Sequence, residues 1–125
     1  MPPLILLVDD DPLIRSLGKE LLEHLGYEVE ATRDGREALE CYRRLGKVDL
    51  VILDYYLPDR DGLQVLQDLL TLDPGVRVLM ASGFFSSQEV DRIKDTGAAG
   101  FIYKPYRLAE LENRIRLVLQ GMSGF

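Results

Sequence analysis

The chain has 125 residues, a hydrophobic content of 46% and a formal net charge of −6 at pH 7, which suit one soluble acidic domain. The acidity argues against direct nucleic-acid binding, because phosphate contacts need a basic face. No apolar run approaches the ~20 residues of a membrane span, the N-terminus lacks the features of a signal peptide, and the single cysteine, Cys41, excludes an internal disulfide and fits a reducing, cytoplasmic compartment.

Five short apolar runs, each closed by a turn or cap signal, predict β-strands. In chain order they cover residues 4–8, 27–31, 50–53, 76–81 and 100–103. The second run alternates apolar with polar residues, which indicates a strand that is exposed on one face and lies near a sheet edge. The third run is apolar throughout and predicts a strand that is buried on both faces.

An amphipathic helix is predicted after each strand, because apolar residues recur there at intervals of three and four. Three of the helices have a polar N-cap candidate and a glycine at the end: Asp11 with Gly26, Asp34 with Gly46, and Ser86 with Gly97. Glu37 and Glu89 stand three residues after two of these caps, at capping-box spacing. The third helix ends at Asp73-Pro74-Gly75, and the last, which carries Leu108 and Val118, begins after Arg107, a poor N-cap.

Strands that alternate with helices imply a parallel sheet covered on both faces, and right-handed crossovers leave few ways to wind it. We predict an α/β fold with a five-stranded parallel sheet in the order 2-1-3-4-5, a flavodoxin-like three-layer sandwich. Residues 1–125 then form a single domain whose core spans about 4–119. Residues 120–125 are expected to be a frayed tail or the start of a linker.

Polar side chains follow four of the predicted strands at the point where each strand ends. They are Asp9 and Asp10 after the first strand, Asp54 after the third, Ser82 after the fourth and Lys104 after the fifth. In this winding the four strand ends are neighbours, so the side chains should converge on one crevice at the switch point of the sheet. The chain has no glycine-rich phosphate loop and no dinucleotide fingerprint.

These residue types favour phosphoryl chemistry. Carboxylates that share a cleft raise one another's pKa unless a cation lies among them, and Mg²⁺ is a hard cation that takes such oxygen ligands. We expect Asp9 and Asp10 to hold the metal and Asp54 to be the nucleophile, since a carboxylate can form an acyl phosphate. Lys104 offers a compact positive charge to phosphate oxygens, and Ser82 can donate a hydrogen bond to another oxygen.

The sequence resembles response-regulator receiver domains of two-component signalling, from Leu4 to about Leu119. The resemblance rests on four signatures: Val8-Asp9-Asp10, Leu53-Asp54 with Leu57-Pro58, Ala81-Ser82-Gly83 and Lys104-Pro105. It implies that Asp54 accepts a phosphoryl group from a phosphohistidine on a histidine kinase or a histidine phosphotransfer protein. A chain of this kind is a stoichiometric phosphoacceptor in a phosphorelay and not an ordinary enzyme.

The same resemblance assigns roles around the acceptor. It implies that Asp9, Asp10, Asp54 and the backbone carbonyl of Tyr56 bind Mg²⁺, with Asp9 acting mainly through water. It also implies that Ser82 and Lys104 grip the phosphoryl group. Phe101 matches a switch position whose ring swings inward when Ser82 moves.

The resemblance further implies an output surface made of the helix from about residue 87, the fifth strand and the last helix. A homodimer through this surface is a further expectation. Residues 80–84 and 104–106 also resemble receivers attached to hybrid sensor histidine kinases. Tyr56 and Phe84 are bulky for positions beside the acceptor, and we hypothesise that their rings slow hydrolysis of the acyl phosphate.

Three other functions compete with this one. An aspartyl-phosphate phosphatase or phosphotransferase usually has a second acid two residues after the nucleophile, where this chain has Tyr56. A protein-binding module that is never phosphorylated has no need of five intact site residues. Flavodoxin-type FMN binding is disfavoured because the first turn, where phosphate must lie, is acidic. His24 and Cys41 are interpreted as ordinary helix residues without a catalytic role.

Overall fold

The computed structural model describes residues 1–125 and contains five strands, all of them parallel and in one sheet. They are β1 (Leu4–Val8), β2 (Glu28–Thr32), β3 (Leu50–Asp54), β4 (Val78–Ser82) and β5 (Gly100–Tyr103). The order across the sheet is β2-β1-β3-β4-β5, as predicted. β3 and β4 are buried along their whole length, whereas β2 alternates between buried and exposed residues because it is an edge strand.

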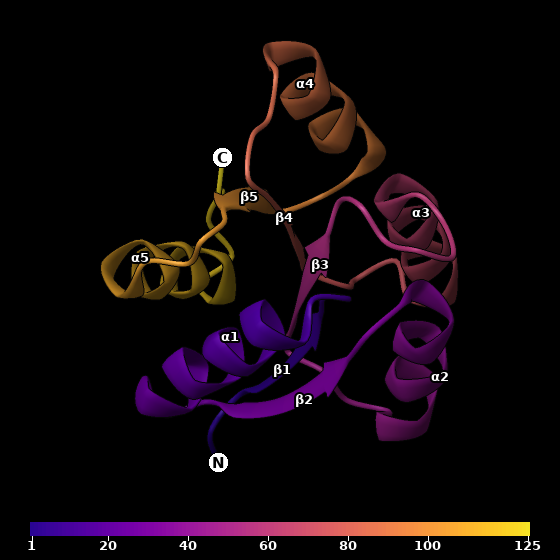
Figure 1. Ribbon diagram of the computed structural model, residues 1–125. Coiled ribbons are helices and arrows are strands. Elements are labelled where there is room, and N and C mark those ends of the chain that lie inside the picture. Colours follow the sequence, from indigo (N-terminus) through magenta and orange to yellow (C-terminus); the bar gives the residue numbers. More distant parts are fainter.

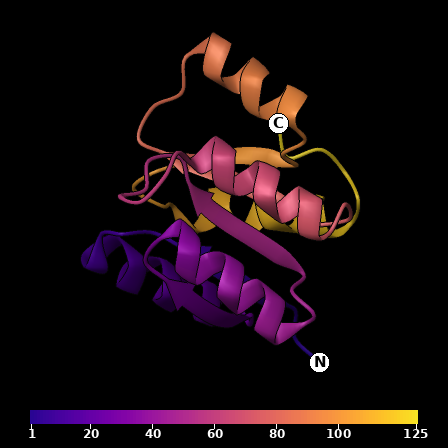
Figure 2. The same cartoon turned by 90° about the vertical axis from the view of Figure 1, so that its right-hand side faces the viewer.

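Five helices connect and flank the strands (Figure 1). They are α1 (Pro12–His24), α2 (Gly35–Leu45), α3 (Gly62–Leu72), α4 (Ser87–Thr96) and α5 (Leu108–Leu119). α1 and α5 cover one face of the sheet, and α2 and α3 lie side by side on the other (Figures 1 and 2). α4 lies on the same side as α3, near the β5 edge, and packs Ile93 into the core that α2 and α3 share.

The hydrophobic core is divided by the sheet into two parts. Residues of alternating strand positions pack against α2, α3 and α4 on one side and against α1 and α5 on the other. This arrangement explains why the central strands are continuously apolar, since both faces of each strand are covered. None of the helices is both long enough and apolar enough to cross a lipid bilayer.

Most predicted helix caps are present. Asp11 caps α1 by accepting from the amides of Leu13 and Ile14 at 2.9 and 3.3 Å. Ser86 and Glu89 form the complete capping box at α4, with hydrogen bonds of 3.1 and 3.0 Å. Arg107, the expected weak cap of α5, makes no side-chain capping bond.

The capping box predicted for α2 is only half formed. Asp34 accepts from the Glu37 amide at 2.8 Å, but the Glu37 carboxylate turns to the Arg33 amide at 3.2 Å and not to that of Asp34. An ion pair of 3.0 Å between Arg33 and Glu37 holds the carboxylate there. The observed strand β4 also starts two residues later than predicted, although the Arg77 carbonyl still accepts from the Val51 amide at 2.9 Å.

Residues 120–125 are not a frayed tail. Gly124 forms a parallel bridge with Gly100 of β5, and its amide donates to the Ala99 carbonyl at 2.8 Å. The expectation of a frayed end failed because it considered only the local sequence, whereas the outer edge of β5 offers backbone groups that this segment can pair with.

Candidate functional site

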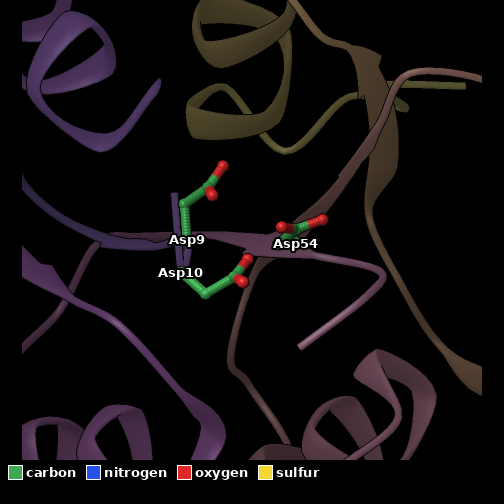
Figure 3. Close-up of side chains that lie close together, drawn as sticks. All are labelled: Asp9, Asp10 and Asp54. Carbon is green, nitrogen blue, oxygen red and sulfur yellow. The ribbon is translucent and has the colours of Figure 1, made fainter. Parts of the chain in front are cut away.

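The parallel register of the sheet places the predicted site residues at one edge. Val8 is paired with Leu53, and Asp54 is paired with Ala81, so the residues that follow β1 and β3 are close to each other and to the end of β4. Asp9 and Asp10 extend from the end of β1 and Asp54 from the end of β3, with their carboxylates gathered around one space beyond the strands (Figure 3).

The carboxylates of Asp9, Asp10 and Asp54 each contribute an oxygen to a cluster in which these atoms lie within 4.8 Å of one another. Asp9 has no exposed surface and Asp54 retains 3%, whereas Asp10 is exposed. The cluster therefore combines two buried acids with one that faces solvent. The Asp10 carboxylate is therefore the member of the cluster that is open to solvent.

Lys104 reaches this cluster from the segment that follows β5. Its ammonium nitrogen lies 2.9 Å from Oδ2 of Asp54 and 3.0 Å from Oδ2 of Asp9. Burial lowers the pKa of Lys104, but the hydrogen bonds and charges of the two carboxylates outweigh it, so the pKa lies above its ordinary value. Lys104 is therefore a fixed positive charge shared by two buried acids.

Asp54 has a raised pKa despite this contact. Burial is the largest cause, the bond and the charge of Lys104 counteract it, and the negative charge of Asp9 adds to it. The amide of Tyr56 donates to Oδ1 of Asp54 at 3.3 Å, and Lys104 takes Oδ2. A carboxylate that is buried, oriented and partly destabilised in its charged form is a suitable acceptor for an electrophilic phosphorus.

The donor set fits a magnesium ion. All of the clustered atoms are hard carboxylate oxygens, and Mg²⁺ prefers such ligands together with waters and phosphate oxygens. The predicted ligands Asp9, Asp10 and Asp54 are thus brought together. The assignment of the Tyr56 backbone carbonyl as a further ligand stays a prediction.

Ser82 lies at the end of β4 and is buried, but its hydroxyl is engaged within its own loop. It donates to the Phe84 carbonyl at 3.0 Å, and the Phe84 amide donates back to it at 3.4 Å. The predicted switch residue Phe101 is partly buried and packs edge-on against Phe85, with ring centroids 5.3 Å apart. Both residues therefore have other partners in this conformation, and the Ser82 hydroxyl bonds the Phe84 backbone and not a carboxylate of the cluster.

Two further residues that the sequence analysis did not identify support the site. Arg15 of α1 donates to the backbone carbonyl of Asp9 at 2.8 Å. Tyr106, two residues after Lys104, is buried with a hydroxyl that has no hydrogen-bond partner, and burial together with the charges of Asp9 and Asp54 raises its pKa. The adjacency of Tyr106 to Lys104-Pro105 was the only sequence signal for either residue.

The strand order and the carboxylates at the switch point define a flavodoxin-like α/β protein of the receiver class. The family model for the response regulator receiver domain matches residues 5–116, and the chain belongs to this family of two-component signalling. The resemblance inferred from the four signatures is confirmed by this match.

Individual proteins are also similar to the chain over most of its length. The chain is 34% identical over 116 residues to the chemotaxis protein CheY of Thermotoga maritima, in a match that covers 89% of this chain and 95% of CheY. It is 35% identical over 126 residues to the transcriptional regulatory protein TrcR of Mycobacterium tuberculosis, in a match that covers 98% of this chain and 47% of TrcR. The chain thus spans about half the length of TrcR and nearly all of CheY.

A solved structure gives the same fold. The CheX–CheY–BeF3–Mg complex from Borrelia burgdorferi matches with a TM-score of 0.89 and 30% sequence identity. The match covers 94% of this chain and 90% of that chain. The predicted flavodoxin-like fold is confirmed by this likeness and by the observed strand order.

Proposed function

We propose that this receiver domain accepts a phosphoryl group on Asp54 from a phosphohistidine of a histidine kinase or a histidine phosphotransfer protein. The observation that carries the proposal is the shared contact of Lys104 with Asp9 and Asp54, at 3.0 and 2.9 Å, beside the exposed carboxylate of Asp10. A fixed cation between an acceptor and a second acid is suited to receive a dianionic group.

The transfer can be written with the residues present. An oxygen of the Asp54 carboxylate attacks phosphorus, the phosphorus–nitrogen bond to the donor imidazole breaks, and the imidazole keeps the electron pair and takes up a proton from water. Lys104 then holds a phosphoryl oxygen in place of part of its contact with Asp54. A magnesium ion held by Asp9, Asp10 and Asp54 would neutralise charge on the transferred group.

We propose that Ser82 and Phe101 change conformation when Asp54 receives the phosphoryl group. The Ser82 hydroxyl has to release the Phe84 carbonyl before it can donate to a phosphoryl oxygen, which couples the state of Asp54 to the loop that follows β4. We propose that the Phe101 ring then moves inward. The surface formed by α4, β5 and α5 is the proposed output surface, and a homodimer through it remains a prediction.

The Borrelia complex joins CheY to Mg, to BeF3, a fluoride that can stand in for a phosphoryl group, and to a second protein, CheX. That complex supports the proposal that the equivalent acids here take Mg²⁺ and that a receiver of this kind has protein partners. A cytoplasmic location and attachment to a hybrid sensor kinase remain predictions for this chain.

The rival interpretation as a hydrolase is tested by stoichiometry. Incubation with Mg²⁺ and phosphoramidate, a small donor with a phosphorus–nitrogen bond, should give one phosphoryl group per chain followed by slow release of phosphate. A phosphatase or phosphotransferase would instead release many equivalents from phosphomonoesters without loss of rate. Sustained turnover of that kind would contradict the proposed function, as would the absence of any transfer from phosphoramidate.

A further inference from the structure

The last residues of the chain occupy the outer edge of β5, which is the final strand of the sheet. Figure 1 shows the C-terminal segment beside β5. The Gly124 amide donates to the Ala99 carbonyl at 2.8 Å, and the Gly124 carbonyl accepts from the Phe101 amide at 3.4 Å. Residues 123–125, which we call the strap, therefore pair with an edge that would otherwise present free backbone groups.

Two glycines permit this close approach. A Cβ atom on Gly100 would collide with the backbone of Gly124, so β5 tolerates no side chain at the point of contact. A Cβ atom on Gly124 would lie 2.8 Å from Cγ2 of Val118 and 3.1 Å from Cδ2 of Leu79. The strap backbone is thus inserted into the space between β5, β4 and α5 and does not merely rest on the surface.

Phe101 is held by the strap and by α5 together. Arg114 donates to the carbonyl of Phe101 at 3.0 Å and to that of Gly124, and its guanidinium lies over the Phe101 ring at 4.8 Å from the centroid. The ring of Phe125 lies 5.9 Å from that of Phe101, and the Lys94 ammonium lies 5.7 Å over Phe125. The strap is therefore held against Phe101 by an aromatic contact and by Arg114, and against α4 by the contact of Lys94 with Phe125.

A continuous row of aromatic rings runs from Phe101 to Tyr55, the residue that follows the acceptor in the sequence. Phe101 packs against Phe85 at 5.3 Å, and Phe85 packs against Tyr55, the residue after Asp54, at 5.8 Å. Phe85 belongs to the same loop as Ser82, whose hydroxyl now bonds the Phe84 backbone. Because Phe85 is buried and its ring packs against that of Phe101, a shift of Phe85 changes the packing around Phe101.

We propose that the strap is docked on β5 while Asp54 is unmodified and is loosened when Asp54 carries a phosphoryl group. The inference rests on the proposed function, since Ser82 must leave its bonds to Phe84 to reach the new group and thereby moves the loop that bears Phe85. Loosening frees the backbone groups of the β5 edge that Gly124 now pairs with. Coupling of this kind is reciprocal, so a weakened strap also favours the modified state, by at most the same factor.

Amide hydrogen exchange of the full chain tests the proposal, with beryllium fluoride and Mg²⁺ as the probe of the modified state. We expect the amides of Gly124 and Phe101 to exchange at least about five-fold faster with the probe, the lower end of ordinary coupling between sites. The amide of Ile52, in the middle of the buried strand β3, is the control, and it should exchange no faster with the probe because ligand binding stabilises the folded chain. Chemical-shift changes at Tyr55 and Tyr56 report whether the probe has bound.

Reciprocity supplies the second measurement. Phe125→Ala removes the ring that contacts Phe101 and should tighten binding of the same probe, by at most the factor by which the probe speeds exchange. Met122→Ala is the matched control, because Met122 belongs to the same C-terminal segment and its side chain is 56% exposed. An equal effect of both variants would contradict a role for the strap.

The outcomes separate the two proposals. If no probe binds at Asp54 in the presence of Mg²⁺, both the proposed function and the strap are wrong. If the probe binds and the Gly124 amide exchanges at an unchanged or slower rate, the strap proposal alone is overturned. Faster exchange confined to Gly124 and Phe101, with tighter binding in Phe125→Ala, supports it.

Discussion

The ammonium group of Lys104 bonds Oδ2 of Asp54 at 2.9 Å, and the side chain of Lys104 is only 18% exposed. The same group bonds Oδ2 of Asp9, which has no exposed surface. A single partly buried cation thus bonds two buried acids. Removal of this cation should lower the free energy of unfolding and slow phosphoryl transfer.

Lys104→Met should reduce the free energy of unfolding by about 3 kcal/mol without Mg²⁺, because it leaves buried carboxylates without their partner. Mg²⁺ should restore part of this loss, and phosphoryl transfer should slow by about 10² to 10³ because a fixed donor to the transferred group is gone. Chemical denaturation and transfer rates measure the two effects. Lys19→Met, an exposed lysine of α1, is the control, and equal behaviour of the two variants would contradict the assigned role of Lys104.

Asp10→Asn should weaken Mg²⁺ binding at least about ten-fold, because Asp10 is the exposed carboxylate of the cluster and a charged ligand to the ion is lost. Calorimetric titration of the unmodified chain measures it. Asp11→Asn is the matched control, since Asn can also accept from the amides of Leu13 and Ile14 as an N-cap. Unchanged Mg²⁺ affinity in Asp10→Asn would remove Asp10 from the site.

Asp59 joins the loop after β3 to α2 by accepting from the amides of Gly35 and Arg36 at 2.9 and 3.0 Å. Asp59→Ala should reduce the free energy of unfolding by about 1 kcal/mol, as expected for loss of a capping carboxylate. The matched control Asp91→Ala changes an exposed aspartate of α4 and should have little effect.

The effect of Asp59 should depend on pH in a defined direction. Burial raises its pKa, but the two amide bonds and the charge of Arg60 outweigh it, so the folded-state pKa is lowered. A lowered pKa stabilises the fold above the unfolded value near ~3.9, and this stability is lost as the pH falls through the folded value. The difference between wild type and Asp59→Ala should therefore be constant near neutrality and shrink below about pH 4. A difference that grows on acidification would be inconsistent with this sign.

Tyr56 and Phe84, two residues after Asp54 and Ser82 respectively, are 64% and 70% exposed. The Tyr56 hydroxyl lies 3.3 Å from Oε2 of Glu89, which ties its ring to α4. Tyr56→Asn and Phe84→Glu should shorten the lifetime of the acyl phosphate, because polar side chains let a water approach the phosphorus. Tyr56→Phe and Phe84→Leu should preserve the lifetime. Unchanged lifetimes in both polar variants would end the hypothesis.

The site was largely predictable because parallel α/β chains have few windings. Once Asp9 and Asp54 were assigned to strand ends, the strand order 2-1-3-4-5 required them to meet, and Lys104 followed from the same topology. Helix starts at Asp11 and Ser86 were equally predictable, since an N-cap acts through amides two or three residues away.

Features that depend on distant partners were not predictable. The strap arises from the contact of Gly124 with Gly100, and neither glycine has a local signal that distinguishes it from an ordinary turn residue. The Glu37 carboxylate bonds Arg33 and not the Asp34 amide. The capping-box spacing of Asp34 and Glu37 in the sequence does not determine which of these two partners the carboxylate bonds. Likewise, the attachment of Ser82 to Phe84 reflects the loop conformation and not the residue type.

Intact mass after incubation with acetyl phosphate and Mg²⁺, compared between wild type and Asp54→Asn, shows whether Asp54 is the phosphoacceptor. We expect one added phosphoryl group on the wild-type chain, lost on treatment with hydroxylamine as an acyl phosphate should be, and none on Asp54→Asn. An unmodified wild-type chain, or equal modification of both chains, would contradict the assignment of Asp54 as the acceptor.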